Sequence, residues 1–218
     1  MLRNTLLICS TLAAFLVLPG QTAQAQMAIG IKGGTAGVGG EFSKSITKKI
    51  NARVSGTFFS YSANGVYEDE PDIAYDVSNN ITSIGLVADY FPFTRGLKLS
   101  AGVFYHDFLI DGGATPTEAY TIEDKTFQPE KLGSLSGKME YESKIVPYAG
   151  IGLGNPVARG SRLKLNLEIG AMYTNSPSFT MEGEGMIGPT ANQDQGFEDG
   201  MKDFKFYPVL NLGLSFRF

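Results

Sequence analysis

The chain has 218 residues, with 27 glycines, 15 phenylalanines, 10 tyrosines, no tryptophan and a single cysteine. Its formal net charge of −4 at pH 7 lacks the basic excess that nucleic-acid-binding domains show, so no nucleic-acid partner is expected. One cysteine cannot form an intramolecular disulfide framework. A chain of this length suits one domain with a sizeable core or one closed barrel, and the glycine and aromatic content favours the barrel.

The N-terminal residues have the features of a secretory signal peptide. Arg3 supplies a positive charge, an apolar stretch runs from Leu6 to Leu18, and Ala23-Gln24-Ala25 forms a cleavage site of small residues. The apolar stretch is about 13 residues long, which is shorter than the roughly 20 residues of a membrane-spanning helix. We therefore expect residues 1–25 to be a cleaved signal peptide and residues 26–218 to form an outer-membrane β-barrel without cysteine.

The mature segment contains no apolar run of spanning length, so a membrane location would require strands. Several segments alternate between apolar and polar residues, as strands do when they place successive side chains on opposite faces. Each is near the roughly 9 to 11 residues with which a tilted strand crosses a bilayer. In chain order these segments are 36–42, 50–61, 83–91, 97–106, 144–154, 162–174 and 206–218.

The polar face of these segments separates two fold hypotheses. In the segment 162–169, Arg162, Lys164, Asn166 and Glu168 alternate with leucine and isoleucine. A soluble β-sandwich also alternates, but it would keep such a charged face in bulk water. A membrane barrel would hold the charges in its lumen and place the leucines against lipid.

The links between these segments alternate in length. Short links lie at 43–49, 94–96 and 155–161, and long ones at 63–80, 111–143 and 175–205. Outer-membrane barrels have short periplasmic turns and longer external loops. This alternation predicts that the last strand runs toward the periplasm and leaves Phe218 at the periplasmic rim.

The alternating segments give seven strands. Single-chain bacterial barrels have an even number of strands, so one more strand is expected. The apolar register changes between Ile31 and Val38, which a bulge or a hairpin at Gly33-Gly34 would explain. Ser178–Met186 is a second candidate for the missing strand. We predict an all-β fold, a closed antiparallel transmembrane β-barrel of eight strands, with the first and seventh strands unassigned.

The chain ends in NLGLSFRF, which resembles the C-terminal assembly signal of bacterial outer-membrane proteins. Asn211 is the polar residue of this pattern, Gly213 follows two places on, and Phe216 and Phe218 are the alternating aromatics. The resemblance implies that the barrel-assembly machinery pairs with this segment during insertion.

The wider resemblance is to the small outer-membrane β-barrel proteins of Gram-negative bacteria, of the OmpA, OmpX and OmpW type. The stretches DYFPF, LSAGVFY, PYAGIGLG and DFKFYPVLNLGLSFRF are similar to recurring stretches of a proteobacterial family described only as outer membrane proteins. The resemblance implies a location in the outer membrane, in contact with lipid and lipopolysaccharide. It implies no chemistry.

An eight-stranded barrel is only just wide enough for its interior side chains to fill it. Charges in so narrow an interior must pair, which predicts a network of ion pairs and no wide channel. A narrow path for small solutes, with the charges as a selectivity ring, is the alternative. The residues expected to face the lumen are Glu41, Arg53, Asp89, Lys98, Lys164, Glu168 and Arg217.

An enzymatic function is the least favoured hypothesis. Some outer-membrane barrels are lipid-modifying hydrolases that use a His-x-Ser pair, and the resemblance fails here because Phe108 stands where that serine would follow His106. We therefore expect no catalytic residue and no cofactor. The expected function is a structural or surface-interaction role.

The external segments are the remaining place for a specific function. One of them is rich in carboxylates, which could attract divalent cations. Because these residues lack a regular ligand spacing, a solvated acidic loop is preferred and no metal site is expected. The sequence identifies no partner for these loops. The acidic residues concerned are Glu68, Asp69, Glu70, Asp72 and Asp76.

Overall fold

The computed structural model describes residues 26–67, 72–93, 96–122, 125–186, 188 and 200–218. The expected signal peptide and its cleavage site, residues 1–25, lie outside these residues. Within the described part of the chain, no helix combines the length and the apolar character needed to cross a membrane.

Eight strands form a closed, hydrogen-bonded antiparallel ring, which confirms the predicted barrel. Their order around the ring is β5-β4-β3-β2-β1-β12-β10-β9, and β9 pairs again with β5. Every ring strand therefore has a neighbour on both sides. The ring strands are β1 (Met27–Gly34), β2 (Gly37–Ser45), β3 (Ile50–Tyr67), β4 (Ile73–Tyr90), β5 (Leu97–Pro116), β9 (Ile145–Leu153), β10 (Leu163–Tyr173) and β12 (Phe206–Arg217).

The strand that completes the ring is β1, which forms a hairpin with β2. Gly34 pairs with Gly37, so the loop consists of Thr35 and Ala36 and lies just after the predicted Gly33-Gly34 position. Gly37 has a φ of 97°, a left-handed conformation that glycine adopts without steric cost. The hairpin explains why the apolar positions change from odd to even numbers between the two strands.

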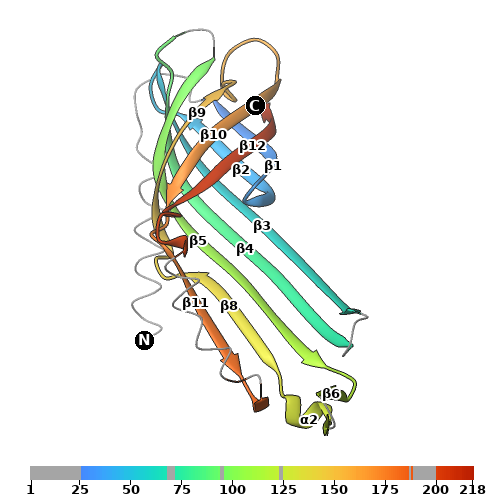
Figure 1. Ribbon diagram of the computed structural model, residues 1–218. Coiled ribbons are helices and arrows are strands. Elements are labelled where there is room, and N and C mark those ends of the chain that lie inside the picture. The colour runs from blue at the N-terminus through green and yellow to red at the C-terminus, as the bar shows by residue number, and fades with distance from the viewer. Residues whose placement is uncertain (1–25, 68–71, 94–95, 123–124, 187, 189–199) are drawn as a thin grey trace, which may run out of the picture.

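Three ring strands continue far beyond the barrel. β2 pairs with β3 only as far as Phe58, and β9 pairs with β5 only as far as Tyr105. Past these points β3, β4 and β5 remain paired with one another, β8 (Leu135–Tyr141) pairs with β5, and β11 (Pro177–Gly183) pairs with β8. Figure 1 shows these five strands projecting from one end of the barrel. We call this five-stranded sheet the extension.

The predicted long link at 63–80 is wrong, because β3 continues to Tyr67 and β4 begins at Ile73. The second candidate for a ring strand is also wrong, since it falls on β11 in the extension. The remaining long segments contain further elements. They are β6 (Tyr120–Ile122), β7 (Lys125–Phe127) and the short helix α2 (Pro129–Leu132), in addition to β8 and β11.

The three short links predicted from the sequence lie together at the opposite end of the barrel from the extension, whereas the β1–β2 hairpin lies at the extension side. They join β2 to β3, β4 to β5 and β9 to β10. The last residue of the chain lies at the same end, because the Phe218 backbone N–H donates to the Met27 carbonyl at 3.1 Å. We call this the short-turn end.

Candidate functional site: the barrel interior and its two ends

The outer wall of the ring is apolar and exposed. Ile31 and Leu165, for example, are 69% and 65% exposed. A soluble monomer rarely presents so continuous an apolar belt to water, whereas a membrane barrel presents one to lipid. The outward positions of β1, β3, β4, β10 and β12 carry these side chains, among them Ile29, Val54, Phe58, Ile84, Leu86, Leu163, Leu167, Leu212, Leu214 and Phe216.

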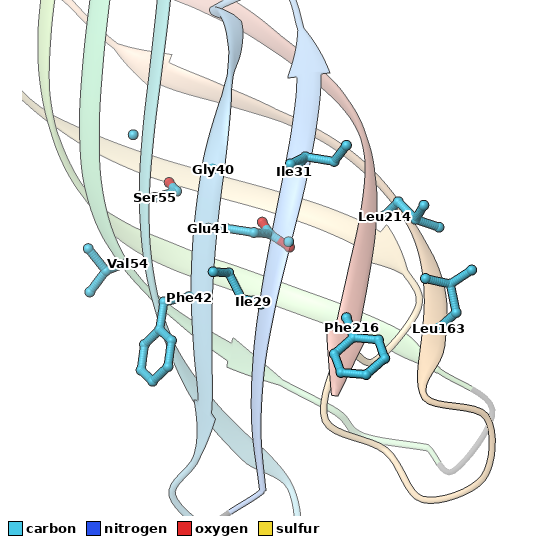
Figure 2. Close-up of a pocket in the computed structure, with 12 residues that line it drawn as sticks. Ile29, Ile31, Gly40, Glu41, Phe42, Val54, Ser55, Leu163, Leu214 and Phe216 are labelled. Atoms are coloured by element: carbon cyan, nitrogen blue, oxygen red, sulfur yellow. The ribbon is translucent and has the colours of Figure 1, made fainter. Parts of the chain in front are cut away.

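The outer wall has a shallow hollow of about 690 Å³. Its floor includes Gly40 and Gly56, which pair directly across β2 and β3. Figure 2 shows the apolar side chains of Ile31, Phe42 and Val54 around it. A Cβ at Gly56 would meet no atom within 4 Å, so packing does not require glycine there. The hollow exists because side chains are missing from this part of the wall.

The interior contains a buried network centred on Arg53 of β3. Its guanidinium donates to Asp89 of β4 with Nε 2.9 Å from Oδ2 and Nη2 2.9 Å from Oδ1. Nη2 also lies 2.7 Å from Glu168 Oε2, and Nη1 lies 3.4 Å from Glu41 Oε2. Lys98 of β5 is the second cation, in contact with Glu168 and 3.8 Å from Asp89 Oδ1. The network joins strands on opposite sides of the ring.

Neutral side chains complete the hydrogen bonding of these carboxylates. The Tyr148 hydroxyl donates to Glu168 Oε1 at 2.5 Å, and the Ser100 hydroxyl donates to Asp89 Oδ1 at 2.7 Å. The Ser215 hydroxyl donates to Glu41 Oε1 at 3.2 Å. Buried charges are stable only when they are paired and hydrogen-bonded, and this arrangement meets both conditions.

Two residues expected among the lumen charges lie outside this network. Lys164 and Arg217 are half-buried at the short-turn end, where the Arg217 Nη2 donates to the Gly160 carbonyl at 3.3 Å. The other five, Glu41, Arg53, Asp89, Lys98 and Glu168, come together in the network.

An apolar layer crosses the lumen on the extension side of the network. The rings of Phe104 and Tyr148 meet edge to face at 5.2 Å. Neighbouring glycines make room for them. A Cβ at Gly85, on the adjacent strand β4, would lie 2.2 Å from the Phe104 ring, and one at Gly150, two residues from Tyr148 on β9, would lie 2.3 Å from the Tyr148 hydroxyl. The layer consists of Val87, Phe104, Val146, Tyr148, Met172 and Val209.

A second set of rings lies at the mouth of the barrel that faces the extension. His106 is fully buried, and its ring centroid is 4.6 Å from that of Tyr207. Phe108 and Tyr141 pack beside it, with centroids 5.3 Å apart. Burial raises the pKa of the Tyr141 hydroxyl, and a hydrogen bond with Thr174 opposes this effect. From the short-turn end toward the extension, the lumen thus contains the charged network, the apolar layer and then the rings around His106.

His106 has a serine partner that the spacing of the sequence does not reveal. Ser83 lies directly opposite it on β4, and the Ser83 Oγ is 2.7 Å from His106 Nδ1. Both side chains are buried, and the His106 Nε2 has no hydrogen-bond partner among the described residues. A serine nucleophile needs access to substrate and a group that orients its histidine, and this buried pair provides neither.

Sequence reasoning missed two further interior residues. Lys32 faces the lumen, with its Nζ 6.0 Å from the centre of the Phe104 ring. Its inward orientation was not predicted, because the apolar register changes at the β1–β2 hairpin. Tyr148 alternates with glycines on the inward side of β9. It was missed because the lumen residues were predicted from charged side chains, and β9 has none on that side. A search for aromatic residues that alternate with glycines on the inward side of a strand would have found it.

Several buried polar atoms in the interior have no partner within the described part of the chain. Polar atoms of this kind are usually satisfied by ordered water. They suggest water between the network and the barrel wall, on the polar side of the apolar layer. Besides His106 Nε2, those in the ring are Ser43 Oγ, Ser55 Oγ, Asn166 Oδ1, Asn211 Oδ1 and Arg217 Nε.

In the extension the polarity of the two faces is reversed. The pairing of β3, β4 and β5 has no break, so the face that continues the lumen wall can be followed outward. That inner face is largely apolar and aromatic, and Tyr61 is 59% exposed. It carries Phe59, Tyr61, Tyr75, Val77, Phe108, Ile110, Met139, Phe179 and Met181. The opposite face carries Ser60, Ser62, Asp76, Ser78, Asn80, Asp111, Lys138, Glu140, Thr180 and Glu182.

The acidic segment expected between β3 and β4 is only partly described. Glu68, Asp69 and Glu70 lie outside the described residues, whereas Asp72 and Asp76 are at the start of β4 and on its outer face. Among the residues that the structure describes, no group of three potential metal ligands is close enough to hold an ion. At the mouth of the barrel, the side chain of Lys144 is 3.1 Å from Asp107, and this contact raises the Lys144 pKa.

The expected assembly-signal residues all lie in or next to β12. Asn211 and Gly213 face the lumen, whereas Phe216 and Phe218 are exposed near the short-turn end. Just after β4, Phe93 is exposed, whereas Phe91 is buried and does not face the outside of the barrel.

The sequence matches no known family model. It also matches no curated protein. Two crystal structures of Acinetobacter baumannii proteins are similar in fold. CarO2 is 19% identical with a TM-score of 0.61, covering 89% of this chain and 99% of that chain. CarO is 20% identical with a TM-score of 0.60, covering 88% of this chain and 97% of that chain.

A weaker match is a major outer membrane protein from Thermus thermophilus, 17% identical with a TM-score of 0.43, covering 89% of this chain and 99% of that chain. At such identities the similarity to CarO and CarO2 shows a shared fold. The chain therefore has the closed β-barrel fold of small outer-membrane proteins.

Proposed function

We propose that this protein is an integral outer-membrane barrel of a Gram-negative bacterium, with a closed lumen, that holds the extension at the cell surface for interaction with external partners. The observation that carries the proposal is the continuation of β3, β4 and β5 beyond the ring with the polarity of their faces exchanged. A barrel that served only as a membrane plug would not need this sheet.

The polarity exchange supports a boundary between lipid and water at the end of the ring. Within the ring the outward positions are apolar, as lipid contact requires. In the extension the outward positions of β3 are Ser60, Ser62 and Asn64, which suit water, followed by Val66 near the strand end. Apart from the β1–β2 hairpin, the short turns are at the other end, and short turns are periplasmic in this class of barrel. The extension is accordingly assigned to the outside of the cell.

The interior supports a closed lumen rather than a channel. An ion that entered would meet the network of Arg53, whose charges are already compensated, and then the apolar layer around Phe104. Entry of an unpaired charge into an apolar layer carries a large desolvation penalty. Eight-stranded barrels are also narrow enough to be filled by side chains. The lumen is therefore proposed to stabilise the barrel without conducting.

The test combines folding and conductance of the mature protein. Refolded in detergent, it should be rich in strands and should migrate faster on a gel before boiling than after boiling. In planar bilayers the same preparation should give no conductance steps above the lipid baseline. A protein that stays soluble without detergent and never shifts on boiling would contradict the membrane assignment, and stable ion conductance would contradict the closed lumen.

A second candidate function is a narrow path for small solutes. The unpartnered polar atoms of Ser43, Ser55 and Asn166 favour it, because they indicate water in the part of the lumen near the short-turn end. Conduction would additionally require the apolar layer to move. A conductance that appears only under applied voltage would favour this candidate over the permanently closed barrel.

A further inference from the structure

The short-turn end of the barrel presents a basic surface. Lys48 and Lys49 are exposed in the turn between β2 and β3, and Arg159 and Arg162 are exposed in the turn between β9 and β10. The short turns 46–49, 91–96 and 154–162 contain no aspartate or glutamate. We call these four exposed residues the basic rim.

The side-chain carboxylates of the barrel interior do not compensate the basic rim. Glu41, Asp89 and Glu168 are buried in the interior, where they bind Arg53 and Lys98. Half-buried Lys164 and Arg217 add further positive charge at the mouth of the lumen on the same side. The Nε of Arg217 has no hydrogen-bond partner within the described part of the chain. Positive charge at this end is therefore in excess.

Two hydrogen bonds hold the turns of the basic rim in place. The Asn51 side-chain amide, at the base of the first turn, donates to Asn155 Oδ1 in the second turn at 3.0 Å. The same oxygen accepts the Val157 backbone N–H at 3.2 Å. The two turns are thereby tied together at one end of the barrel. The four basic side chains therefore stand on opposite sides of the same rim.

The basic rim begins where the apolar belt of the outer wall ends. Lys49 directly precedes Ile50, which is exposed on the wall, and Arg162 directly precedes Leu163, which is also exposed. One residue of strand corresponds to about 3.3 Å, so a long basic side chain can place its charge just beyond the belt. In a bilayer, that level is occupied by lipid headgroups.

We propose that the basic rim binds the phosphate groups of anionic phospholipids in the leaflet that surrounds the short-turn end. This inference rests on the proposed function, because it requires the ring to span a bilayer. Lysine ammonium and arginine guanidinium groups are donors that match phosphate oxygens, and basic residues beside a membrane are attracted to its anionic lipids. The outer side of the opposite end lacks such an excess of positive charge, since Asp76 and Asp111 lie there and Lys144 is paired with Asp107.

The experiment measures lipid preference in reconstituted vesicles. The full mature protein is inserted into phosphatidylcholine vesicles at low salt, with trace spin-labelled phosphatidylglycerol or spin-labelled phosphatidylcholine. The fraction of each label that is immobilised at the protein surface gives its relative association. The wild type should favour phosphatidylglycerol by on the order of fivefold, as expected for about 1 kcal/mol from basic residues near the surface. Salt near 1 M should largely remove the preference through screening.

The decisive variant is K48Q/K49Q/R159Q/R162Q, which should lose most of this preference. A matched control, K131Q/K138Q/K144Q/K205Q, removes the same number of positive charges from the extension side and should keep it. If the fourfold variant does not fold, the pairs K48Q/K49Q and R159Q/R162Q are used, and each should lose part of the preference. Gel migration before and after boiling verifies folding for every protein.

The outcomes separate this inference from the proposed function. An inserted, heat-modifiable wild type without preference for phosphatidylglycerol would overturn the inference alone. The same holds for a preference that the rim variants and high salt leave unchanged. A wild type that does not enter the vesicles as a folded barrel would contradict the proposed function, and the inference with it.

Discussion

Arg53 and Asp89 form a bidentate ion pair inside the barrel, with two N–O distances of 2.9 Å and side-chain exposures of 2% and 0%. They lie on neighbouring strands, and Asp89 stands opposite Asn51, two residues from Arg53. Planar guanidinium and carboxylate groups in this geometry make two parallel hydrogen bonds. The pair is the centre of the network on which the interior depends.

Replacing Arg53 with alanine should destabilise the barrel strongly. The change leaves Asp89, Glu168 and Glu41 buried with Lys98 as the remaining cation of the network, and loss of one partner from a buried pair costs about 3–5 kcal/mol. The free energy of unfolding in urea, measured in detergent micelles, checks this. Lys48→Ala, at an exposed site, should change it by less than about 0.5 kcal/mol. A loss below about 1 kcal/mol for Arg53→Ala would mean that the network is not structurally important.

Removing the apolar layer should allow ions to pass. The double variant F104A/M172A deletes two of its large side chains, and the space left behind connects to the polar part of the lumen. Planar bilayer recordings should show small conductance steps that are absent from the wild type. Phe58→Ala, which deletes a ring from the outer wall, is the control and should not conduct. If neither variant conducted ions, other residues would have to close the lumen.

Two glycines of neighbouring strands should respond differently to alanine. At Gly56 the added Cβ meets no atom within 4 Å, so Gly56→Ala should be neutral or stabilising by up to about 1 kcal/mol through reduced freedom of the unfolded chain. At Gly39 the Cβ would lie 1.9 Å from the Gly56 carbonyl oxygen, and overpacking of this kind costs about 1–3 kcal/mol. Unfolding of both variants in urea provides the comparison. Equal effects would contradict the strand packing.

The orientation in the membrane can be tested with single cysteines, since the only cysteine of the full chain lies at position 9, inside the expected signal peptide. Ser62→Cys places a thiol on the exposed outer face of the extension, and Lys48→Cys places one in an exposed short turn. A membrane-impermeant maleimide should label Ser62→Cys on intact cells. It should label Lys48→Cys only after permeabilisation. The reverse pattern would invert the assigned orientation.

Much of the ring could be predicted because the relevant signal is local. The alternation around Leu163 and Leu165, or along β12, follows from the two-residue period of a strand and needs no knowledge of neighbours. The extension was missed in β3 and β4 for a related reason. Beyond Phe58 the outward positions become serine and asparagine, and this reversed polarity resembles a polar loop when the strand partners are unknown.

The contacts inside the barrel were harder to predict from the sequence. Arg53 and Glu168 were both expected to face the lumen, but they are separated by 115 residues, and their contact depends on the stagger of every strand between them. Ser83 and His106 illustrate the same limit, because a search for residues close in sequence cannot find a partner across a strand pair. Lys164 and Arg217 have the correct alternation and yet lie too close to the rim to join the network.

The sequence by itself determined which side of most ring strands is apolar and the positions of three short links between them. These properties follow from side-chain alternation and turn residues, which act over a few positions. The tertiary structure alone decided where β2 and β9 leave β3 and β5, and so where the barrel ends and the extension begins. It also decided which charges meet. Both depend on the register of strands that are distant in the chain, and register is a property of the closed ring as a whole.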